Sequence, residues 1–325
     1  MEADTQEFLL SEDKMKQIRI FCDVAEANGS HLTLKELITL LSLDITESKL
    51  FENWGNLEGL EGYIIAPDFI IHRKQLTDDF GIIQNEYRSS RARAVSNFEF
   101  SHRFASLCNK INVRVLSVSG STSYQSVAKG GDLDFFSIMN AGSLWPSFVK
   151  FLLLARAFRL VHRESPSICL SYVADERFAI REFTKPQDAL FARDAIYTSV
   201  LRGEKYYARL LKSSSWMSKY FPMLYEQRVQ DVEQERRPAI KTSTLARITN
   251  LFVYFIAGKY VRLKSHLLNR RYAKEKKWNS LFRVRIGPDH CIYESERYLH
   301  LRQMYLALDD TNDFVRMNVQ SKDWK

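Results

Sequence analysis

Apolar side chains recur at helical spacing through the N-terminal part of the chain, and the pattern then changes to that of strands. The spacing predicts three helices, over Asp13–Asn28, Thr33–Leu41 and Ile45–Leu57. Gly62–His72 is rich in β-branched residues on both sides of an Ala-Pro-Asp turn, which predicts a hairpin. Three helices followed by a hairpin predict a winged-helix-like module over residues 1–78.

The rest of the chain combines strand-like runs with helical segments. A long helix over 79–110 is predicted to connect the first module to an α/β (α+β) core over 111–185. We expect that core to be a small mixed sheet and residues 186–325 to form a helical C-terminal region. Three strand-like runs lie within the core: Val113–Val118, Asp132–Phe136 and Ile168–Val173.

Composition narrows the class of protein. The 325 residues are 45% hydrophobic and 26% charged, which excludes a disordered or collagen-like chain and suits about two domains. The four cysteines are scattered, which is typical of reduced thiols and not of a disulfide framework or a zinc site. The acidic N-terminus lacks signal-peptide features, and no apolar run approaches the roughly 20 residues of a membrane span. We therefore expect a cytoplasmic protein without a transmembrane segment.

Charge is distributed unevenly. Residues 1–80 carry 7 Lys or Arg against 16 Asp or Glu, a net of −9, whereas residues 241–285 carry 12 against 1, a net of +11. Because phosphate neutralisation dominates DNA affinity, the acidic module is expected to pack on another domain or hold a protein partner, not to read DNA. The basic segment suits either phosphate binding, in a nucleotide or a nucleic acid, or a solvated surface. Within it, the pattern of Leu251–Gly258 favours a buried amphipathic helix over one lying on a membrane.

Candidate chemistry lies between the first two strands of the core. Val113–Val118 runs directly into Gly120 and Ser121, and a glycine there leaves backbone N–H groups open to a phosphate. Asp132 and Asp134 begin the next strand, and strand alternation places both carboxylates on one face. Two carboxylates one strand repeat apart are suited to sharing a divalent cation such as Mg²⁺.

A strand, Gly-Ser, a short interval and then Asp-hydrophobic-Asp resembles the signature of the DNA polymerase beta-like nucleotidyltransferase superfamily. The resemblance implies that Gly120 and Ser121 hold the triphosphate of an NTP, and that Asp132 and Asp134 bind Mg²⁺ or Mn²⁺. It implies transfer of a nucleoside monophosphate to a hydroxyl acceptor with release of pyrophosphate. More widely, residues 120–225 look like a group of poorly characterised bacterial and archaeal nucleotidyltransferase-domain proteins that have a winged-helix-like front module.

The sequence departs from the superfamily at the third catalytic carboxylate. That acid usually stands on the following strand, where this chain has Ser171; Asp175, just beyond, is a candidate third metal ligand or a solvated turn residue. A catalytically weak or inactive nucleotide-binding regulator is therefore the alternative, with the acidic module holding a protein partner. The acceptor stays open between a nucleic acid, a nucleotide, a protein side chain and a small molecule.

Further side chains are candidates for contact with the nucleotide. Lys129 precedes the aspartates and is placed to neutralise a triphosphate, and Lys212 with Ser214 or Ser215 is placed to contact its outer phosphates. Trp145, Trp216 and Tyr220 either stack on a base or belong to the core. A third function class is a nucleic-acid-binding scaffold that uses residues 241–285.

Overall fold

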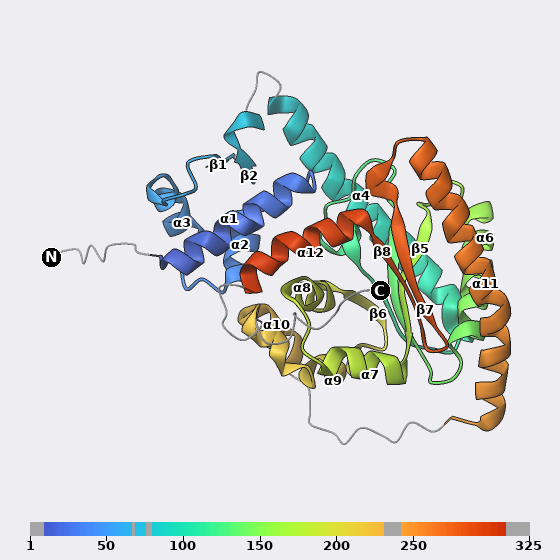
Figure 1. The fold of residues 1–325 in the computed structure, drawn as a ribbon. Helices are drawn as coiled ribbons and strands as arrows, with labels where there is room; N and C mark the ends of the chain where they lie inside the picture. The colour runs from blue at the N-terminus through green and yellow to red at the C-terminus, as the bar shows by residue number, and fades with distance from the viewer. Residues whose placement is uncertain (1–9, 67–68, 76–79, 231–241, 310–325) are drawn as a thin grey trace.

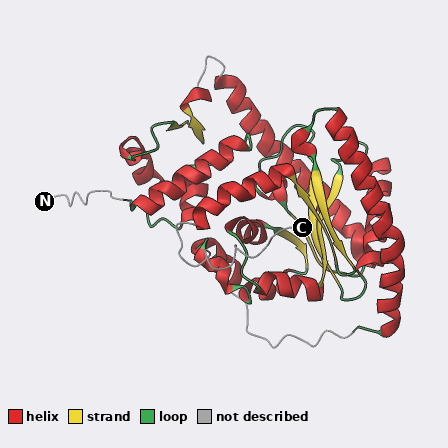
Figure 2. Cartoon of the chain, in the orientation of Figure 1, coloured by secondary structure: helices red, strands yellow, loops and turns green. Residues whose placement is uncertain are grey.

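The centre of the fold is a six-stranded mixed sheet, seen in a computed structural model that describes residues 10–66, 69–75, 80–230 and 242–309 (Figures 1 and 2). Its strand order is β6-β3-β4-β5-β8-β7. Only the β4–β5 neighbours run parallel, which confirms the predicted mixed sheet. The strands are β3 (Val113–Val118), β4 (Leu133–Met139), β5 (Ile168–Asp175), β6 (Ser199–Arg202), β7 (Phe282–Gly287) and β8 (His290–Ser295).

Helices cover both faces of this sheet, which is why its central strands are apolar along most of their length. In β4, Leu133 and Phe135 point to one apolar cluster, whereas Phe136 and Ile138 point to the other. One face carries α4 (Phe80–Leu107), α6 (Leu144–Val161) and α11 (Thr244–Lys274). The other carries α7 (Glu176–Thr184), α8 (Ala189–Tyr197), α9 (Glu204–Lys212), α10 (Pro222–Val229) and α12 (Glu296–Asp309).

The N-terminal part contains three helices and a hairpin in the predicted order. Thr33 opens the second helix with a capping box to Glu36. Leu32 pairs with Ile70, so that the hairpin is tied to the chain between the first two helices. The predicted turn residues Pro67 and Asp68 lie outside the described residues. The elements are α1 (Glu12–Ala27), α2 (Leu34–Leu41), α3 (Glu47–Asn53), β1 (Tyr63–Ile65) and β2 (Ile70–His72).

This acidic N-terminal part packs on the rest of the chain through apolar side chains. The ring of Phe21 on α1 lies edge-on to Tyr305 of α12, with centroids 5.8 Å apart. The backbone N–H of Met223 donates to the Ser42 hydroxyl at 3.0 Å, which joins α10 to the end of α2. Its apolar core is continuous with that of α8, α10 and α12.

Two sequence predictions hold only in part. The C-terminal region is not wholly helical, because β6, β7 and β8 supply half of the sheet. The long helix α11 is buried on one side only along Leu251–Gly258: Gly258 is buried, whereas Phe252, Phe255 and Ile256 are each more than 60% exposed. No described helix is long and apolar enough to cross a membrane.

Candidate active site

The loop after β3 is held tightly against β4. The backbone N–H of Ser119 donates to the Asp134 carbonyl at 3.0 Å, and the next residue, Gly120, has a φ of +63°. A Cβ on Gly120 would stand 2.9 Å from Oδ2 of Asp134, so only glycine fits this turn without displacing the carboxylate. The four-residue helix α5 (Gly120–Ser123) follows at once, anchored where Asn97 of α4 donates to Thr122 at 3.1 Å.

Asp132 and Asp134 lie at the amino end of β4, on the same side as Phe136. Asp134 is paired in register with Cys169 of β5, whose thiol hydrogen-bonds to its carboxylate. The third-acid position sought in β5 is therefore occupied by Cys169 and Ser171. The Ser171 hydroxyl lies 3.4 Å from that of Ser119 and 3.3 Å from the Phe135 carbonyl, so it closes the floor between β3 and β5.

The electrostatics of this edge disfavour the ionised carboxylates. Burial raises the pKa of Asp134 to about 7, with help from the charges of Asp132 and Asp194. Burial also raises the pKa of Asp132, although a hydrogen bond from Ser167 and the charge of Arg159 act in the opposite direction. Asp134 therefore stands in a place that would gain from a nearby cation.

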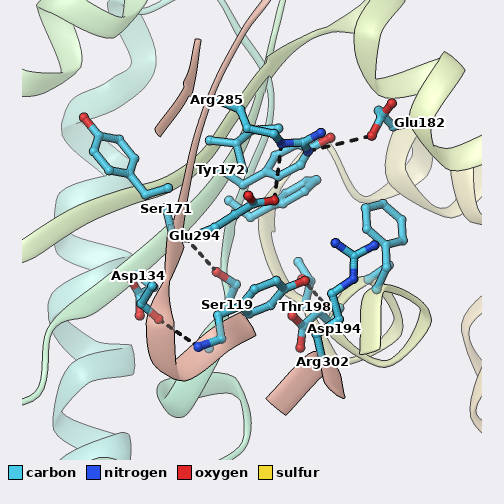
Figure 3. A pocket seen from close by; sticks show the side chains of 18 of the residues that line it. Ser119, Asp134, Ser171, Tyr172, Glu182, Asp194, Thr198, Arg285, Glu294 and Arg302 are labelled. Carbon is cyan, nitrogen blue, oxygen red and sulfur yellow. Dashed lines mark hydrogen bonds and ion pairs between the residues drawn. The ribbon is translucent and has the colours of Figure 1, made fainter. Parts of the chain in front are cut away.

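A large cleft opens at this edge of the sheet, with a volume of about 1380 Å³ (Figure 3). Its walls come from segments far apart in the chain: the β3–α5 loop, the amino ends of β4 and β5, α8, the turn η4 (Ser215–Lys219), α11, the β7–β8 hairpin and α12. Aromatic side chains from η4 and α8 line one part of the cleft, where the rings of Phe191 and Trp216 lie 6.2 Å apart. Charged side chains and further apolar ones, such as Phe148 and Leu152 of α6, line the rest.

Several of the charged groups that line the cleft are paired with one another. Arg285 of β7 lies 3.3 Å from Glu294 and 3.9 Å from Glu182 (Figure 3). Arg302 of α12 donates to Asp188 at 2.6 Å. Lys264 of α11 also lines the cleft. Burial and the nearby aspartates raise the pKa of the Cys169 thiol, and the charge of Lys264 offsets a small part of that rise. The cleft thus presents both carboxylates and cations to a ligand.

The structure brings together some of the predicted site residues and not others. Gly120, Asp132, Asp134 and Ser215 line the cleft, as do Trp216 and Tyr220. Among the described residues, Ser121, Lys129 and Lys212 do not belong to its lining, and Lys219 is the η4 lysine that does. Ser214 is buried and donates to the Leu210 carbonyl at 2.9 Å, and Trp145 is buried with its indole N–H on the Gly287 carbonyl at 3.0 Å. Neither reaches the cleft.

Asp175 is not a third ligand beside the aspartate pair. In the parallel register Asp134 faces Cys169, and Asp175 lies six residues farther along β5, about 20 Å away at strand rise. There it is the N-cap of α7, accepting from the backbone N–H groups of Arg177 and Phe178 at 3.0 and 2.9 Å. Asp175 is therefore neither a metal ligand nor a solvated turn residue, the two alternatives that the sequence left open. It caps a helix at the opposite end of the strand.

No pattern in the sequence points to Asp194, the acid that does approach the pair. It projects from α8 into the cleft, accepts a hydrogen bond from the Tyr124 hydroxyl, and burial raises its pKa to about 6. Arg193 beside it lies over the Tyr124 ring, 4.3 Å from the centroid, and donates to Tyr305. Only the N-cap pattern that opens α8 at Asp188 is readable from the sequence, and it indicates the helix, not the direction of Asp194.

The aspartate pair fits a hard divalent cation by its donors. Mg²⁺ is commonly held by one or two carboxylates together with substrate phosphates, and Asp132 and Asp134 supply two carboxylates beside the space kept open by Gly120. No group of three or more His, Cys, Asp or Glu arranged around a common point occurs in the described part of the chain. The phosphates of a substrate would have to complete such a site.

Comparison of the chain with family models, curated proteins and solved structures finds no match.

Proposed function

We propose that the protein is a nucleotidyltransferase that moves a nucleoside monophosphate from an NTP to a hydroxyl acceptor and releases pyrophosphate. The observation that carries the proposal is the close packing of Gly120 on the Asp134 carboxylate, at the mouth of a cleft that Asp132 also lines. A loop with an obligatory glycine against a pair of carboxylates is what the Gly-Ser and Asp-x-Asp signature requires. Gly120 and Asp134, which both belong to the sequence signature, are also close to each other in the folded chain.

Asp132 and Asp134 would hold Mg²⁺ or Mn²⁺, which when bound supplies positive charge to the phosphate oxygens. Ser119 and Gly120 line the cleft at the amino edge of β4, where their backbone would face the triphosphate. Lys264, on the opposite wall, adds a cation that neutralises phosphate charge. Together these groups orient the α-phosphorus toward the open part of the cleft.

Asp194 is our candidate for the general base in place of the acid missing from β5. The acceptor oxygen attacks the α-phosphorus, the bond to pyrophosphate breaks, and the hydroxyl proton passes to the Asp194 carboxylate. A pKa of about 6 suits that task, because the group is ionised near neutral pH yet basic enough to take a proton. The hydrogen bond from Tyr124 fixes its orientation.

The cleft is large enough for two reactants. At about 1380 Å³ it exceeds the usual 300–1,000 Å³ of a small-molecule pocket, which leaves room for an acceptor beside an NTP. We assign the nucleobase of the NTP to the aromatic part of the cleft, where Trp216 and Tyr220 of the η4 region offer ring faces for stacking. The charged part lined by Arg285, Glu294 and Arg302 then belongs to the acceptor.

We further propose that the sheet is a nucleotidyltransferase core and that α1 to β2 form a winged-helix module. The antiparallel β3–β4 pair joined by the Gly-Ser loop supports the first assignment. Three helices, a hairpin and the Leu32–Ile70 bridge support the second. The acidic surface of α3, with Glu47 and Glu52 exposed, suits a basic protein partner better than DNA.

A nucleotide-binding regulator without efficient transfer is the second candidate. It is favoured by Cys169 and Ser171, which occupy β5 where the superfamily places its third acid. A variant that removes the proposed general base, Asp194, distinguishes a transferase from a nucleotide-binding regulator. Asp194→Asn should lose turnover in a transferase and leave the regulator's nucleotide affinity unchanged.

Pyrophosphate release is the direct test of the transferase. Purified protein is supplied with each NTP, Mg²⁺ or Mn²⁺, and acceptors from each hydroxyl-bearing class, and is compared with the Asp132→Ala/Asp134→Ala double variant. We expect many turnovers from the wild type and none from the double variant, with an unchanged circular dichroism spectrum. Glu47→Ala/Glu52→Ala removes two exposed carboxylates elsewhere and is the matched control. Equal turnover in the aspartate double variant would reject the proposal.

A further inference from the structure

The outer surface of α6 and α11 is apolar, and it lies on the side of these helices that faces away from the sheet (Figure 1). Of the seventeen large hydrophobic side chains that are exposed among the described residues, twelve belong to these two helices. We call this surface the α6–α11 face. Its members are Leu153, Leu160 and Val161 on α6, and Leu245, Ile248, Leu251, Phe252, Phe255, Ile256, Tyr260, Leu263 and Leu267 on α11.

Helix α11 is apolar on two opposite sides. Its inner side is buried at Asn250, Gly258 and Val261, where Asn250 accepts from the Trp145 backbone at 2.8 Å. At 100° per residue, Phe252 and Leu263 point in roughly the opposite direction from these contacts. A contiguous exposed apolar patch on a folded protein usually marks an interaction surface, so the outer side of α11 is expected to have a partner outside the described chain.

Charge identifies the kind of partner. Neither helix contains a single Asp or Glu, whereas α11 carries seven Lys or Arg and α6 carries three. Lys259 stands among the exposed apolar residues, and Arg270 and Lys274 extend the outer side toward the end of the helix. Arg156 of α6 donates to the Tyr260 hydroxyl of α11 at 2.9 Å, which holds the two helices side by side. The partner must therefore accept apolar side chains and be negatively charged.

We propose that the α6–α11 face binds an anionic lipid surface, with α11 lying in the plane of the interface. Leu, Ile and Phe side chains enter the acyl boundary while the surrounding Lys and Arg meet anionic headgroups. The binding is peripheral, since no described helix is suited to crossing the bilayer.

Other occupants fit the surface less well. Two copies joined through this face would bring cations together without an acid on either helix. The acidic N-terminal part of another copy would match the charge, but among its described residues Phe51 is the one large apolar side chain that is exposed. A nucleic acid would satisfy the lysines and leave the aliphatic side chains in water.

The same helix separates this face from the cleft. Lys264, Ser265, Leu268 and Tyr272 of α11 line the cleft from the helix's inner side. Because a helix with its side chains is about 10–12 Å across, docking would place the cleft within about that distance of the lipid. The lipid-binding proposal does not depend on the proposed transferase activity.

Vesicle sedimentation tests the proposal with the full chain. Vesicles of phosphatidylcholine alone are compared with vesicles of equimolar phosphatidylcholine and phosphatidylglycerol. We expect binding to the anionic vesicles that weakens as salt rises, and at least about tenfold weaker binding to the neutral ones. Ile248→Ser/Phe252→Ser/Phe255→Ser should weaken anionic-vesicle binding by at least about tenfold, because the inserted side chains are lost. The matched control is Phe51→Ser/Ile82→Ser, which removes exposed apolar side chains elsewhere and should bind as the wild type does.

A second readout does not require loss of binding. An environment-sensitive fluorophore on Phe252→Cys labels selectively, since the native cysteines are buried or half-buried. Its emission should shift to shorter wavelength on anionic vesicles, whereas the same label on Phe51→Cys should not shift. Wild-type protein that stays in the supernatant with anionic vesicles overturns the proposal, as does undiminished binding by the triple variant. Sedimentation velocity that shows a dimer dissociated by the triple variant assigns the face to a second copy and also overturns it.

Discussion

The two ends of the parallel pair β4–β5 carry acidic side chains in opposite situations. At the carboxyl end, Asp175 accepts two backbone N–H groups of α7, and Glu176 beside it pairs with Arg114 at 2.8 Å. At the amino end, Asp134 has a thiol as its hydrogen-bond partner and two further carboxylates near enough to raise its pKa. Each end therefore has an aspartate on one strand of the pair, Asp134 on β4 and Asp175 on β5.

The difference separates a carboxylate that serves the fold from one available for chemistry. Backbone N–H groups use up the acceptor capacity of Asp175 and join it to the start of a helix. At the amino end, the carboxylates of Asp132 and Asp134 line an open cleft. This arrangement lowers the free energy of unfolding. Substitutions at the two ends should therefore change different properties of the protein.

The largest expected effect is on turnover at the amino end. Asp194→Asn should lower kcat of the transferase by about 10²–10⁴-fold, because the proposed proton acceptor is lost. Steady-state pyrophosphate release measures this. Asp289→Asn is the control from the carboxyl end, where Asp289 pairs with Arg181 at 2.7 Å, and it should leave kcat unchanged. Equal kcat values for the wild type and Asp194→Asn would remove Asp194 from the mechanism.

The next effect is a gain in stability when the amino end is neutralised. The pKa of Asp134 is raised from 3.8 to about 7 by burial, so the folded state binds a proton more tightly than the unfolded state does. This contribution to stability is present below the unfolded pKa and is lost as pH rises through the folded pKa. Asp134→Asn should raise the free energy of unfolding by about 2 kcal/mol above neutral pH and flatten its pH dependence, as measured by urea denaturation.

Asp289 at the other end should behave in the opposite sense. A hydrogen bond with His290, together with Arg181, holds its pKa at about 2, so its contribution is present above the unfolded pKa and is lost as pH falls toward the folded one.

If wild-type stability instead rose with pH through neutrality and Asp134→Asn did not change that slope, the electrostatic account of the amino end would be wrong.

The next largest expected effect is the loss of stability on removing the N-cap of α7. Asp175→Ala removes the acceptor for two N–H groups of α7 and should lower the free energy of unfolding by about 1–2 kcal/mol. Asp175→Asn keeps a capping oxygen and should recover most of that loss. Neither variant should alter nucleotide affinity, measured by calorimetry, because the residue lies far from the cleft.

The smallest effect is expected at the turn that holds Asp134. Gly120→Ala places a Cβ against the carboxylate and should weaken metal-dependent NTP binding by about 1 kcal/mol, roughly fivefold. Gly130→Ala is the matched control, because Gly130 also has a positive φ, +73°, but open space around its Cβ position. The two variants should lose similar stability, and Gly120→Ala alone should lose affinity. Equal affinities would show that the contact with Asp134 does not matter.

The sequence predicted the parts of the site that are close in the chain. Gly120, Asp132 and Asp134 lie within one strand–loop–strand unit, so spacing and alternation alone place them together. The helices and hairpin of the N-terminal part were predictable for the same reason, since their apolar periodicity is local. Asp132, Asp134 and Gly120 are therefore the part of the cleft that is most easily predicted from the sequence.

The rest of the cleft depends on tertiary contacts that no local pattern encodes. Asp194, Lys264 and Arg285 arrive from α8, α11 and β7, and their directions depend on how those elements pack on the sheet. Asp175 was misplaced because the sequence does not reveal that β5 runs parallel to β4 with its acid at the far end. In β7, Arg283 and Arg285 alternate with apolar residues as in a strand, but they also end the basic segment 241–285, where the run of charge hides that pattern.

Calorimetric titration with each of the four NTPs, with and without Mg²⁺, shows whether Asp132 and Asp134 hold a metal-bound nucleotide. The wild type is compared with Asp132→Ala/Asp134→Ala and with the control Glu47→Ala/Glu52→Ala. The account predicts micromolar-range, Mg²⁺-dependent binding of at least one NTP, kept by the control and lost by the aspartate double variant. Binding that needs no metal, or that survives in the aspartate double variant, would contradict it.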